Sequence, residues 1–416
     1  MYAFILTLKI ISVIITFITT GFMLYQFAIA LFGLKKAARP RPISDKKHRF
    51  AIVISARNEQ SVIGYLIDSL MAQDYPKELF DVIVIADNCT DNTAQVSREH
   101  RAIVYERFNT ALVGKGFALN WLFQQLLEQD PDHYDAICVF DADNVVDTHY
   151  LSEMNLQLCA GAQLAQGYRD SKNPTDTAIS GCYSLYWWTL TRFFHVARNN
   201  MGLSAMVSGT GFMFRTDIIR ESNGWHTNSL CEDCEFSLQN IAAGRKVVLA
   251  YDAVFYDEQP VSFSQSVRQR HRWSVGNLQC IRYCFTDLLK GLVQKGNGNA
   301  LDGLLFLFFI PSVSVGVLGM LVNALIYSTD LAAFLHIIPL LVLGGIALWL
   351  AVMGQAILVL WMEKKPIKPM WKAILYYPVF LLSWMAINFV GLYYQSKVWK
   401  PIDHTKEMGI EQIKQR

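Results

Sequence analysis

Long stretches without a charged residue lie near both ends of this chain and restrict how it can fold. No charged side chain occurs from Ile10 to Phe32, and a helix of about 23 residues crosses a hydrocarbon core of roughly 30 Å. Three more uncharged stretches follow later, at Leu304–Tyr327, Leu331–Met362 and Ala373–Gln395. With 52% hydrophobic and 17% charged residues, the chain is also more apolar than an ordinary cytosolic protein. We therefore predict membrane helices on both sides of a central domain.

Basic residues next to the first stretch predict its orientation. Seven of them, opposed only by Asp45, follow it directly: Lys35, Lys36, Arg39, Arg41, Lys46, Lys47 and Arg49. The positive-inside rule then places Met1 outside and the next domain in the cytosol. We predict a multi-pass protein of the cell membrane with a cytoplasmic catalytic domain. The net charge of only +2 gives no footprint for nucleic acid, so we expect no nucleic-acid partner.

The carboxyl end poses a conflict of topology. Three full crossings would leave the tail outside, yet both the tail and the loop 363–368 are rich in lysine. Both segments stay in the cytosol if Ala373–Gln395 enters the membrane and returns on the same side, with Pro378 as the bend. We expect that re-entrant arrangement. The second stretch is long enough to tilt, or to break at Gly344-Gly345.

The middle of the chain alternates strand and helix patterns. Short apolar runs predict strands, and amphipathic segments between them predict helices. The strands are expected at Phe50–Ser55, Phe80–Ala86, Ala102–Glu106 and Ala136–Phe140, and the helices at Ser61–Gln73, after Asp91, and at Gly116–Glu128. This alternation indicates an α/β domain with a mostly parallel sheet and helices on both faces. Ligands of such sheets bind beyond the carboxyl ends of the strands.

Polar residues follow each of these four strands. They are Ala56-Arg57-Asn58-Glu59, the segment Asp87–Thr93, Lys115–Asn120 and Asp141-Ala-Asp143. Each alone is a common turn or helix-cap pattern, whereas four on one sheet edge favour a nucleotide site. The glycine motifs of dinucleotide and phosphate-loop sites are missing from the sequence. Asp141 and Asp143 are suited instead to Mg²⁺ or Mn²⁺, hard cations that bridge phosphates.

Four later segments also carry functional side chains. Ser208–Gly211, Cys231–Glu235 and Gln269–Trp273 are rich in polar residues, and Tyr183–Phe194 is rich in aromatic ones. Simpler explanations exist for them: acids favour the first turn of a helix, and aromatic and basic residues collect at membrane interfaces. Aromatic rings also pack well against sugars. The eight cysteines include two close pairs, but neither a ribbon nor a finger spacing for zinc, so reduced thiols are expected.

This ordered set resembles the membrane-bound, inverting family-2 glycosyltransferases of the GT-A fold. That group includes cellulose, hyaluronan, chitin-oligosaccharide and poly-N-acetylglucosamine synthases. The resemblance runs from Phe50 to Trp273 and is most specific at Gln269-x-x-Arg272-Trp273, downstream of Asp-x-Asp and Glu-Asp. It departs at Cys231, where the family has the threonine of Thr-Glu-Asp. The segment Trp399–Thr405 is loosely similar to the cytosolic gating segment of polymer-forming members.

The resemblance assigns roles to individual residues. It implies Asp233 as general base, with Gln269, Arg272 and Trp273 holding the diphosphate and the acceptor sugar. The implied donor-binding residues are Ala56, Asn58, Glu59, Asp87, Lys115 and Asp141. The implied metal ligands are Asp143 and Asp141, and the implied acceptor-binding residues are Gly209, Thr210, Glu232 and Trp273.

The expected function is transfer of a sugar from a UDP-sugar to a growing β-linked polysaccharide at the cytoplasmic membrane face, coupled to export. One alternative is addition of one sugar to a membrane lipid, and another is a non-catalytic scaffold. The expected partners are a UDP-sugar, a carbohydrate or lipid acceptor and membrane lipids. The expected domains are 1–49, a membrane helix with a basic segment; 50–258, the GT-A domain; 259–300, interfacial helices; 301–396, membrane helices; and 397–416, a basic tail.

Overall fold

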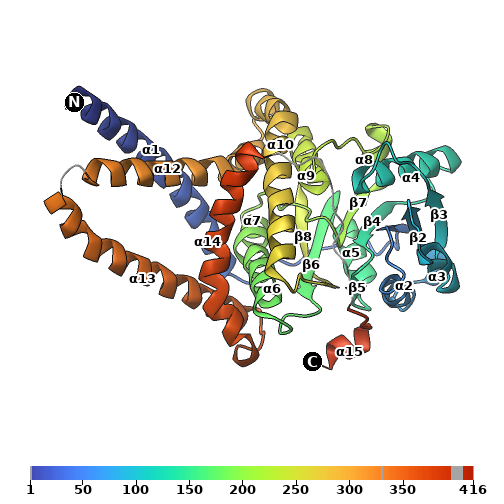
Figure 1. Cartoon of the computed structure of the whole chain (residues 1–416). Coiled ribbons are helices and arrows are strands. Elements are labelled where there is room, and N and C mark those ends of the chain that lie inside the picture. The colour runs from blue at the N-terminus through green and yellow to red at the C-terminus, as the bar shows by residue number, and fades with distance from the viewer. Residues whose placement is uncertain (1, 329–330, 395–405, 416) are drawn as a thin grey trace.

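The computed structural model describes residues 2–328, 331–394 and 406–415, and combines an α/β domain with long apolar helices (Figure 1). The strands of the domain are β1 (Phe50–Ala56), β2 (Phe80–Asp87), β3 (Ile103–Arg107), β4 (Ala136–Asp141), β5 (Val145–Val146), β6 (Leu164–Ser171), β7 (Phe212–Arg215) and β8 (Val247–Asp257). Its helices are α2 (Ile63–Met71), α3 (Thr93–Glu99), α4 (Lys115–Gln129), α5 (Tyr150–Cys159), α6 (Ala178–Leu190), the π-helical turn η3 (Thr191–Val196), α7 (Ala197–Asn200), α8 (Thr216–Glu221) and α9 (Glu232–Ala243).

The sheet has the order β3-β2-β1-β4-β7-β6-β8-β5. The four predicted strands, β1 to β4, pair with one another in parallel. Beyond them, β7 runs antiparallel to both β4 and β6, and β6 pairs in parallel with β8. The prediction of an α/β domain with a mostly parallel sheet is therefore confirmed.

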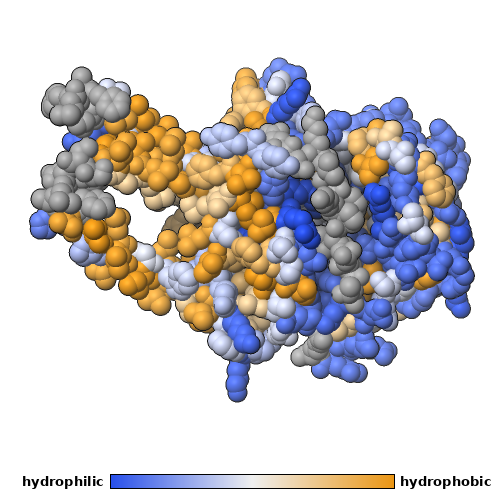
Figure 2. All heavy atoms as spheres, in the orientation of Figure 1, coloured by the Kyte–Doolittle hydropathy of each residue, from blue (hydrophilic) through white to orange (hydrophobic). Residues whose placement is uncertain are grey.

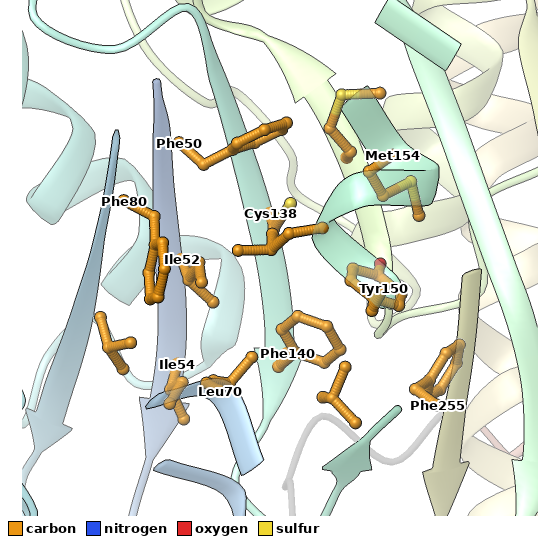
Figure 3. Close-up of a cluster of buried hydrophobic side chains, with 14 of the residues drawn as sticks. Phe50, Ile52, Ile54, Leu70, Phe80, Cys138, Phe140, Tyr150, Met154 and Phe255 are labelled. Carbon is orange, nitrogen blue, oxygen red and sulfur yellow. The ribbon is translucent and has the colours of Figure 1, made fainter. Parts of the chain in front are cut away.

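Both faces of the sheet are buried, because the residues of β1 alternate between two cores. Phe50, Ile52 and Ile54 point into a core with α2 and α5, which Figure 3 shows in close-up. Ala51 and Val53 point into the opposite core with α4, α8 and α9. Because both faces of this strand are buried, its side chains point into one core or the other, which explains its continuous apolar sequence. Polar side chains follow β1, β2 and β4 where these strands end.

The remaining helices include several long apolar ones. The full set of remaining α-helices is α1 (Tyr2–Ala30), α10 (Phe263–Lys295), α11 (Gly298–Leu307), α12 (Phe309–Ser328), α13 (Leu331–Met362), α14 (Trp371–Tyr393) and the short α15 (Ile410–Lys414). Among the described residues, four segments are long and apolar enough to cross a membrane: Leu6–Leu34, Phe309–Ile326, Ile338–Met362 and Lys368–Tyr393. Figure 2 shows their hydrophobic surface gathered at one end of the molecule, over α1, α12 and α13.

Helices α1 and α12 run side by side away from the α/β domain (Figure 1). Their contact includes a hydrogen bond of 2.8 Å from Ser12 Oγ to Asn323 Oδ1. Helix α13 leads back, and Glu363 just after it accepts hydrogen bonds from Tyr168, Arg192 and Tyr251 of the α/β domain. The loop after α13 therefore lies on the same side as that domain. Helix α13 is continuous through Gly344-Gly345, so the chain does not break there.

Helix α14 is continuous through Pro378, so the prediction that this segment enters and returns at a proline bend is wrong. Its contacts with α6 and α10 extend along its length, from Ala373 beside Gly181 to Tyr394, whose carbonyl is 3.1 Å from His271 Nε2. In Figure 1 it runs across the boundary between the α/β domain and α12 and α13. Helix α14 is long enough to span a membrane. Its packing against α6 and α10, and not a bend at Pro378, keeps it beside the α/β domain.

The end of the chain returns to the α/β domain. Lys406 Nζ is 2.5 Å from Asp176, and Lys414 Nζ is 2.8 Å from Asp147. The backbone N–H of Lys406 also donates to Glu258, at 3.1 Å. Residues 406–415 thus lie on the same side as the domain, while the cytosolic location of both stays a prediction. The suspected gating segment 399–405 falls outside the described residues.

We predict that the carboxyl end and the α/β domain react with thiol reagents from the same side of the membrane. Gln415→Cys and Asp132→Cys are each placed in a Cys89→Ser background, because the other seven cysteines are buried. With a membrane-impermeant maleimide, neither variant is labelled in intact cells and both are labelled after permeabilisation. Labelling of Gln415→Cys alone in intact cells would contradict this topology.

Candidate functional site

A cavity of about 1450 Å³ lies at the carboxyl ends of β1, β2 and β4 and extends to the apolar helices α12 and α14. It is the place where most of the residues singled out in the sequence meet. Those lining it are Glu59, Asp87, Lys115, Asp141, Asp143, Gly209, Glu232, Asp233, Gln269, Arg272 and Trp273. These residues come from separate loops and helices, and their convergence in one cavity makes it the candidate active site.

The loop after β4 presents two carboxylates to the cavity. The Asp143 side chain is buried and accepts a hydrogen bond of 3.2 Å from the Asn144 amide. The Asp141 carboxylate is more exposed and forms an ion pair with Lys115 at the start of α4. Lys115 Nζ also donates to the Gly209 carbonyl, at 2.6 Å. The ammonium group therefore joins the β4 loop to the loop before β7.

A divalent cation fits this pair of carboxylates. In the described parts of the chain, no cluster of three or more Asp, Glu, His or Cys side chains could hold a metal. Mg²⁺ and Mn²⁺ often bind through only one or two carboxylates and complete their shells with water and substrate phosphates. Asp141 and Asp143 would thus hold a cation together with a bound diphosphate. Such a cation, when bound, neutralises negative charge on the leaving phosphate.

Asp87, at the end of β2, is held by a residue that the sequence analysis missed. Arg107 Nη1, at the end of β3, lies 2.6 Å from Asp87 Oδ1, and both side chains are buried. A second nitrogen of Arg107 donates to the Leu112 carbonyl, at 2.7 Å. Asn88 Nδ2 also donates to Asp87, at 3.0 Å. These bonds fix the carboxylate at the cavity wall. The parallel pairing of β2 and β3 places Asp87 opposite Arg107, a register that no local motif reveals.

Glu232 and Asp233 form the first turn of α9, where the helix dipole favours acidic groups. Both face the cavity. Burial raises the pKa of both carboxyls, and repulsion from Asp233 adds to the rise for Glu232. Gly209 lies directly beside them, since a Cβ placed on it would be 3.4 Å from Asp233 Oδ2. A raised pKa suits a carboxylate that accepts a proton near neutral pH.

Helix α10 brings Gln269, Arg272 and Trp273 to the opposite wall. Within the described chain, no carboxylate lies within ion-pair distance of Arg272. The ring of Trp273 contacts Trp187 of α6 and Trp384 of α14, with centroids 5.6 and 6.2 Å apart. The aromatic segment of α6 thus divides: Tyr186 and Trp187 line the cavity, while Trp188 is buried and donates to Asp170.

Three predicted site residues lie outside the cavity lining: Ala56, Asn58 and Thr210. Asn58, with φ +57°, donates from its side-chain amide to the Thr90 hydroxyl and accepts at Oδ1 from the Thr90 backbone N–H, and thereby joins the loops after β1 and β2. Thr210 is buried, and its hydroxyl oxygen accepts from the Asp141 N–H, at 2.9 Å, and donates to Asn144. The structure thus gives Thr210 a bracing position beneath the loop that carries Asp141 and Asp143.

Other cavity residues were also missed because they follow no motif. Arg169, on β6, forms an ion pair of 3.3 Å with Asp257 on β8, and its guanidinium lies 3.9 Å from the centroid of the Trp187 ring. Lys172, just after β6, lies behind the cavity lining, buried near Asp143, and burial lowers the pKa of its ammonium group. Only the antiparallel β7 and the crossover to β8 bring these residues to the same edge as Asp143.

Comparison with known proteins agrees with this geometry. The sequence model of the family described as "Glycosyltransferase like family 2" matches residues 48–276. The "Probable glycosyltransferase YdaM" of Bacillus subtilis is 24% identical over 297 residues, which cover 70% of this chain and 68% of that protein. The "Beta-monoglucosyldiacylglycerol synthase" of Nostoc sp. is 26% identical over 282 residues, covering 64% of this chain and 57% of the synthase.

A solved structure shares the fold. The mannosyltransferase PcManGT from Pyrobaculum calidifontis, determined in complex with GDP-Man and Mn²⁺, superposes with a TM-score of 0.61. The superposition covers 93% of this chain and 99% of that one, at 16% sequence identity. It therefore includes the apolar helices as well as the sheet.

We predict that Arg107→Ala strongly destabilises the protein, because it leaves the Asp87 carboxylate buried without its partner. Breaking such a buried pair typically costs about 3–5 kcal/mol. The matched control is Arg98→Ala, which removes a solvent-exposed pair with Glu106 and should cost about 0–1 kcal/mol. Thermal unfolding in detergent measures both. Equal shifts for the two variants would show that the Asp87–Arg107 pair does not hold this edge of the sheet.

Proposed function

The chain belongs to the glycosyltransferase-like family 2, and on that basis we propose that it transfers one sugar from a nucleotide diphosphate to a hydroxyl group of a membrane lipid. Membership makes it a glycosyltransferase that uses a nucleotide-sugar donor. The identity of the acceptor is the part that we propose. Single addition to a lipid was the alternative in the sequence analysis, and the cavity favours it over polymer synthesis.

The observation that carries this proposal is the continuity of the cavity. One end contains the carboxylates and cations of the sheet edge, including Asp87, Lys115 and Asp143. The other end is lined by apolar side chains of membrane-type helices, such as Phe309, Ile310 and Val313 of α12. A nucleotide sugar is polar and would not bind at the apolar end. A lipid can bind at both ends if its head group reaches the charged sheet edge while its hydrocarbon chains contact the apolar helices.

Further support comes from the relatives. The names of several similar proteins state a lipid product, beta-monoglucosyldiacylglycerol. This chain matches between 47% and 57% of the length of these synthases, so its own acceptor is inferred from the cavity. The mannosyltransferase with the same fold was solved with a nucleotide sugar and Mn²⁺. That complex supports a donor diphosphate beside Asp141 and Asp143 in this chain.

In the proposed reaction, the acceptor hydroxyl oxygen attacks the anomeric carbon of the sugar from the face opposite the diphosphate. A new C–O bond forms as the bond between the sugar and the phosphate oxygen breaks, and the nucleotide diphosphate leaves. Asp233 accepts the hydroxyl proton, and its raised pKa strengthens it as a base. Arg272 faces the developing negative charge with a guanidinium that can hold two phosphate oxygens.

The neighbouring residues position these groups. Lys115 forms an ion pair with Asp141 and donates a hydrogen bond to the Gly209 carbonyl. It therefore connects the loop of Gly209, beside Asp233, to the loop of Asp141. We propose Asp87 and Glu59 for binding of the nucleoside. The Trp187 and Trp273 rings offer flat faces against which a sugar packs.

A second candidate is a polysaccharide synthase, which the segment Gln269-x-x-Arg272-Trp273 favours. A synthase that exports its polymer needs a walled passage across the membrane. In the described part of one chain, only 11% of the span in α1 and of that in α13 is buried, and 17% of that in α12. Helices so little covered by one another do not build such a wall. The lipid therefore remains the better-supported acceptor.

The nature of the product tests this proposal. Purified protein in lipid vesicles is incubated with a panel of radiolabelled nucleotide sugars. We expect the label in the organic phase after extraction, in a compound that migrates as a lipid with one added sugar. Label retained in a water-soluble polymer of high mass would contradict lipid transfer and favour the synthase.

We also predict that Asp233→Asn lowers kcat by about 10² to 10⁴, the usual loss for a general base. Donor binding should stay within about twofold, because the amide keeps the shape of the side chain and removes only the proton acceptor. The control is Asp132→Asn, an exposed acid of the α/β domain outside the cavity. Turnover of Asp233→Asn within about tenfold of the wild type would rule out Asp233 as the base.

A further inference from the structure

Arg169 of β6 lines the cavity but has no part in the reaction described above. Its side chain is only 7% exposed, and its guanidinium group contacts three separate parts of the site. One nitrogen forms the ion pair with Asp257, and a second donates to the Ser208 carbonyl. The guanidinium carbon lies 3.9 Å from the centroid of the Trp187 ring. A single buried cation therefore connects three walls of the cavity.

The contact with Ser208 brings this cation close to the proposed base. The Ser208 carbonyl carbon is bonded to the nitrogen of Gly209, and a Cβ placed on Gly209 would lie 3.4 Å from Asp233 Oδ2. The guanidinium group and the Asp233 carboxylate are therefore separated by little more than one peptide unit. Gly209 has φ +82°, a conformation that favours glycine, so no side chain lies between the two groups at this turn.

Side chains hold this loop on both sides. The Ser208 N–H donates to Gln166 Oε1, at 2.8 Å, while the Ser208 carbonyl accepts from Arg169. The next carbonyl, of Gly209, accepts from Lys115, at 2.6 Å. Two cations and one amide thus fix the backbone beside the base. Gln166 supports Ser208 as Arg169 does, but without a charge, so mutation can separate support from charge.

The charged groups that face Asp233 come from four elements: Glu232 of α9, Lys115 of α4, Arg272 of α10 and Arg169 of β6. Burial raises the pKa of Asp233, and the three cations oppose that rise. The neighbouring thiols carry no charge near neutral pH. Burial raises the pKa of Cys231, and a hydrogen bond with Cys280 together with burial raises that of Cys234. The cations are therefore the groups that favour an ionised base.

We propose that Arg169 is a positioning residue for the base: its guanidinium group clamps the loop of Ser208 beside Asp233 and places a positive charge near that carboxylate. The inference rests on the proposed reaction, in which Asp233 accepts the hydroxyl proton, and it holds for any hydroxyl acceptor. Because Arg169 also lies against Trp187, which packs on Trp273, it fixes the base and the aromatic wall relative to each other.

The pH dependence of kcat tests the role of the charge. Asp233 accepts a proton only when it is ionised, and a nearby positive charge favours the ionised form. Arg169→Gln removes that charge and leaves Asp257 unopposed, so the pKa of Asp233 rises and the acid limb of the profile moves to higher pH. Arg169→Lys keeps the charge and should keep the limb. Both variants should lower kcat at high pH about tenfold, because neither side chain reproduces the three contacts.

Full-length protein in vesicles with dioleoylglycerol is assayed by release of nucleotide diphosphate, with saturating donor and Mn²⁺, from about pH 5 to about pH 9. If the lipid is not accepted, transfer to water gives the same readout, because it also needs a base. For Arg169→Gln, we expect the loss of kcat to be at least about threefold larger at the acid end than at the alkaline end. The KM for the donor should stay within about twofold.

The matched control is Gln166→Leu, which loosens the other side of Ser208 without changing a charge and should lower kcat equally at every pH. Arg98→Gln, which removes an exposed cation, should change neither kcat nor the limb. The charge has no role at the base if the limb stays in place in Arg169→Gln, or moves as far in Arg169→Lys or in Gln166→Leu.

Binding of the nucleotide diphosphate shows that each variant is folded, and Asp257 keeps its hydrogen bonds from Asn144 and Gln259 in all of them. If Arg169→Gln does not fold, a wild-type kcat in Arg169→Lys would overturn the clamp. Failure of the proposed function gives different results: turnover by Asp233→Asn near the wild-type rate removes the base, and label in a water-soluble polymer removes the lipid acceptor.

Discussion

Two buried arginines hold the membrane-type helices against the α/β domain, and the cavity depends on them. Arg192 lies within the π-helical turn η3, which follows α6, and Arg198 lies in α7 directly after it. Arg192 is paired with Glu363 after α13, at 2.5 Å, and Arg198 with Asp302 of α11, at 2.8 Å. Tyr25 of α1 also donates to Asp302, at 3.0 Å. Loss of one partner of such a pair leaves a buried charge, which typically costs about 3–5 kcal/mol.

These ion pairs determine how the cavity is closed. They fix α1, α11 and the end of α13 beside η3, whose Phe194 and His195 line the cavity. Helix α14 then fills the space against α6 and α10 and supplies Trp384 and Asn388. A π-helical turn inserts an extra residue into a helix and is frequent at functional sites. Here the turn contains Arg192, and its residues Phe194 and His195 line the cavity.

The two ends of the cavity differ in their electrostatics, and this difference is the basis of the proposed chemistry. At the sheet edge, charges are balanced within the site: Asp87 by Arg107, Asp141 by Lys115, and Asp257 by Arg169. Arg272 is left to meet a diphosphate. At the other end the wall consists largely of apolar side chains of α12 and α14, such as Phe309, Ile310 and Val390. The charged nucleotide sugar thus matches the sheet edge, and the amphipathic lipid matches the apolar end.

Much of the sheet and of the site was predictable from local patterns. The apolar runs of β1 to β4 are continuous because both faces of the sheet are buried, and the chain shows this directly. The GT-A fold and the glycosyltransferase activity follow from the same motifs and agree with the family match. The antiparallel β7 escaped because its four residues lie after the glycines of Ser208–Gly211 and look like part of a loop.

Other features depend on pairs far apart in the sequence. Arg107, Arg169 and Arg192 follow no motif, and their roles come from partners across the sheet or beyond it. The re-entrant prediction for α14 failed because Pro378 was judged alone: the helix continues through it and packs against α6 and α10. Thr210 shows the same limit. The family resemblance implied a contact between Thr210 and the acceptor, whereas in the structure its hydroxyl group hydrogen-bonds to the Asp141 N–H and to Asn144.

The central claim, that one cavity connects the nucleotide site to the membrane, is tested most directly by photo-crosslinking. A diacylglycerol with a photoreactive group near the start of one acyl chain is incorporated into vesicles with the protein and irradiated, and the labelled peptides are identified by mass spectrometry. We expect labelling of residues 306–313 and 381–390, at the wall of α12 and α14, and a decrease of this labelling in an excess of unlabelled diacylglycerol. Labelling confined to the outer surface of α13, unaffected by that competitor, would contradict it.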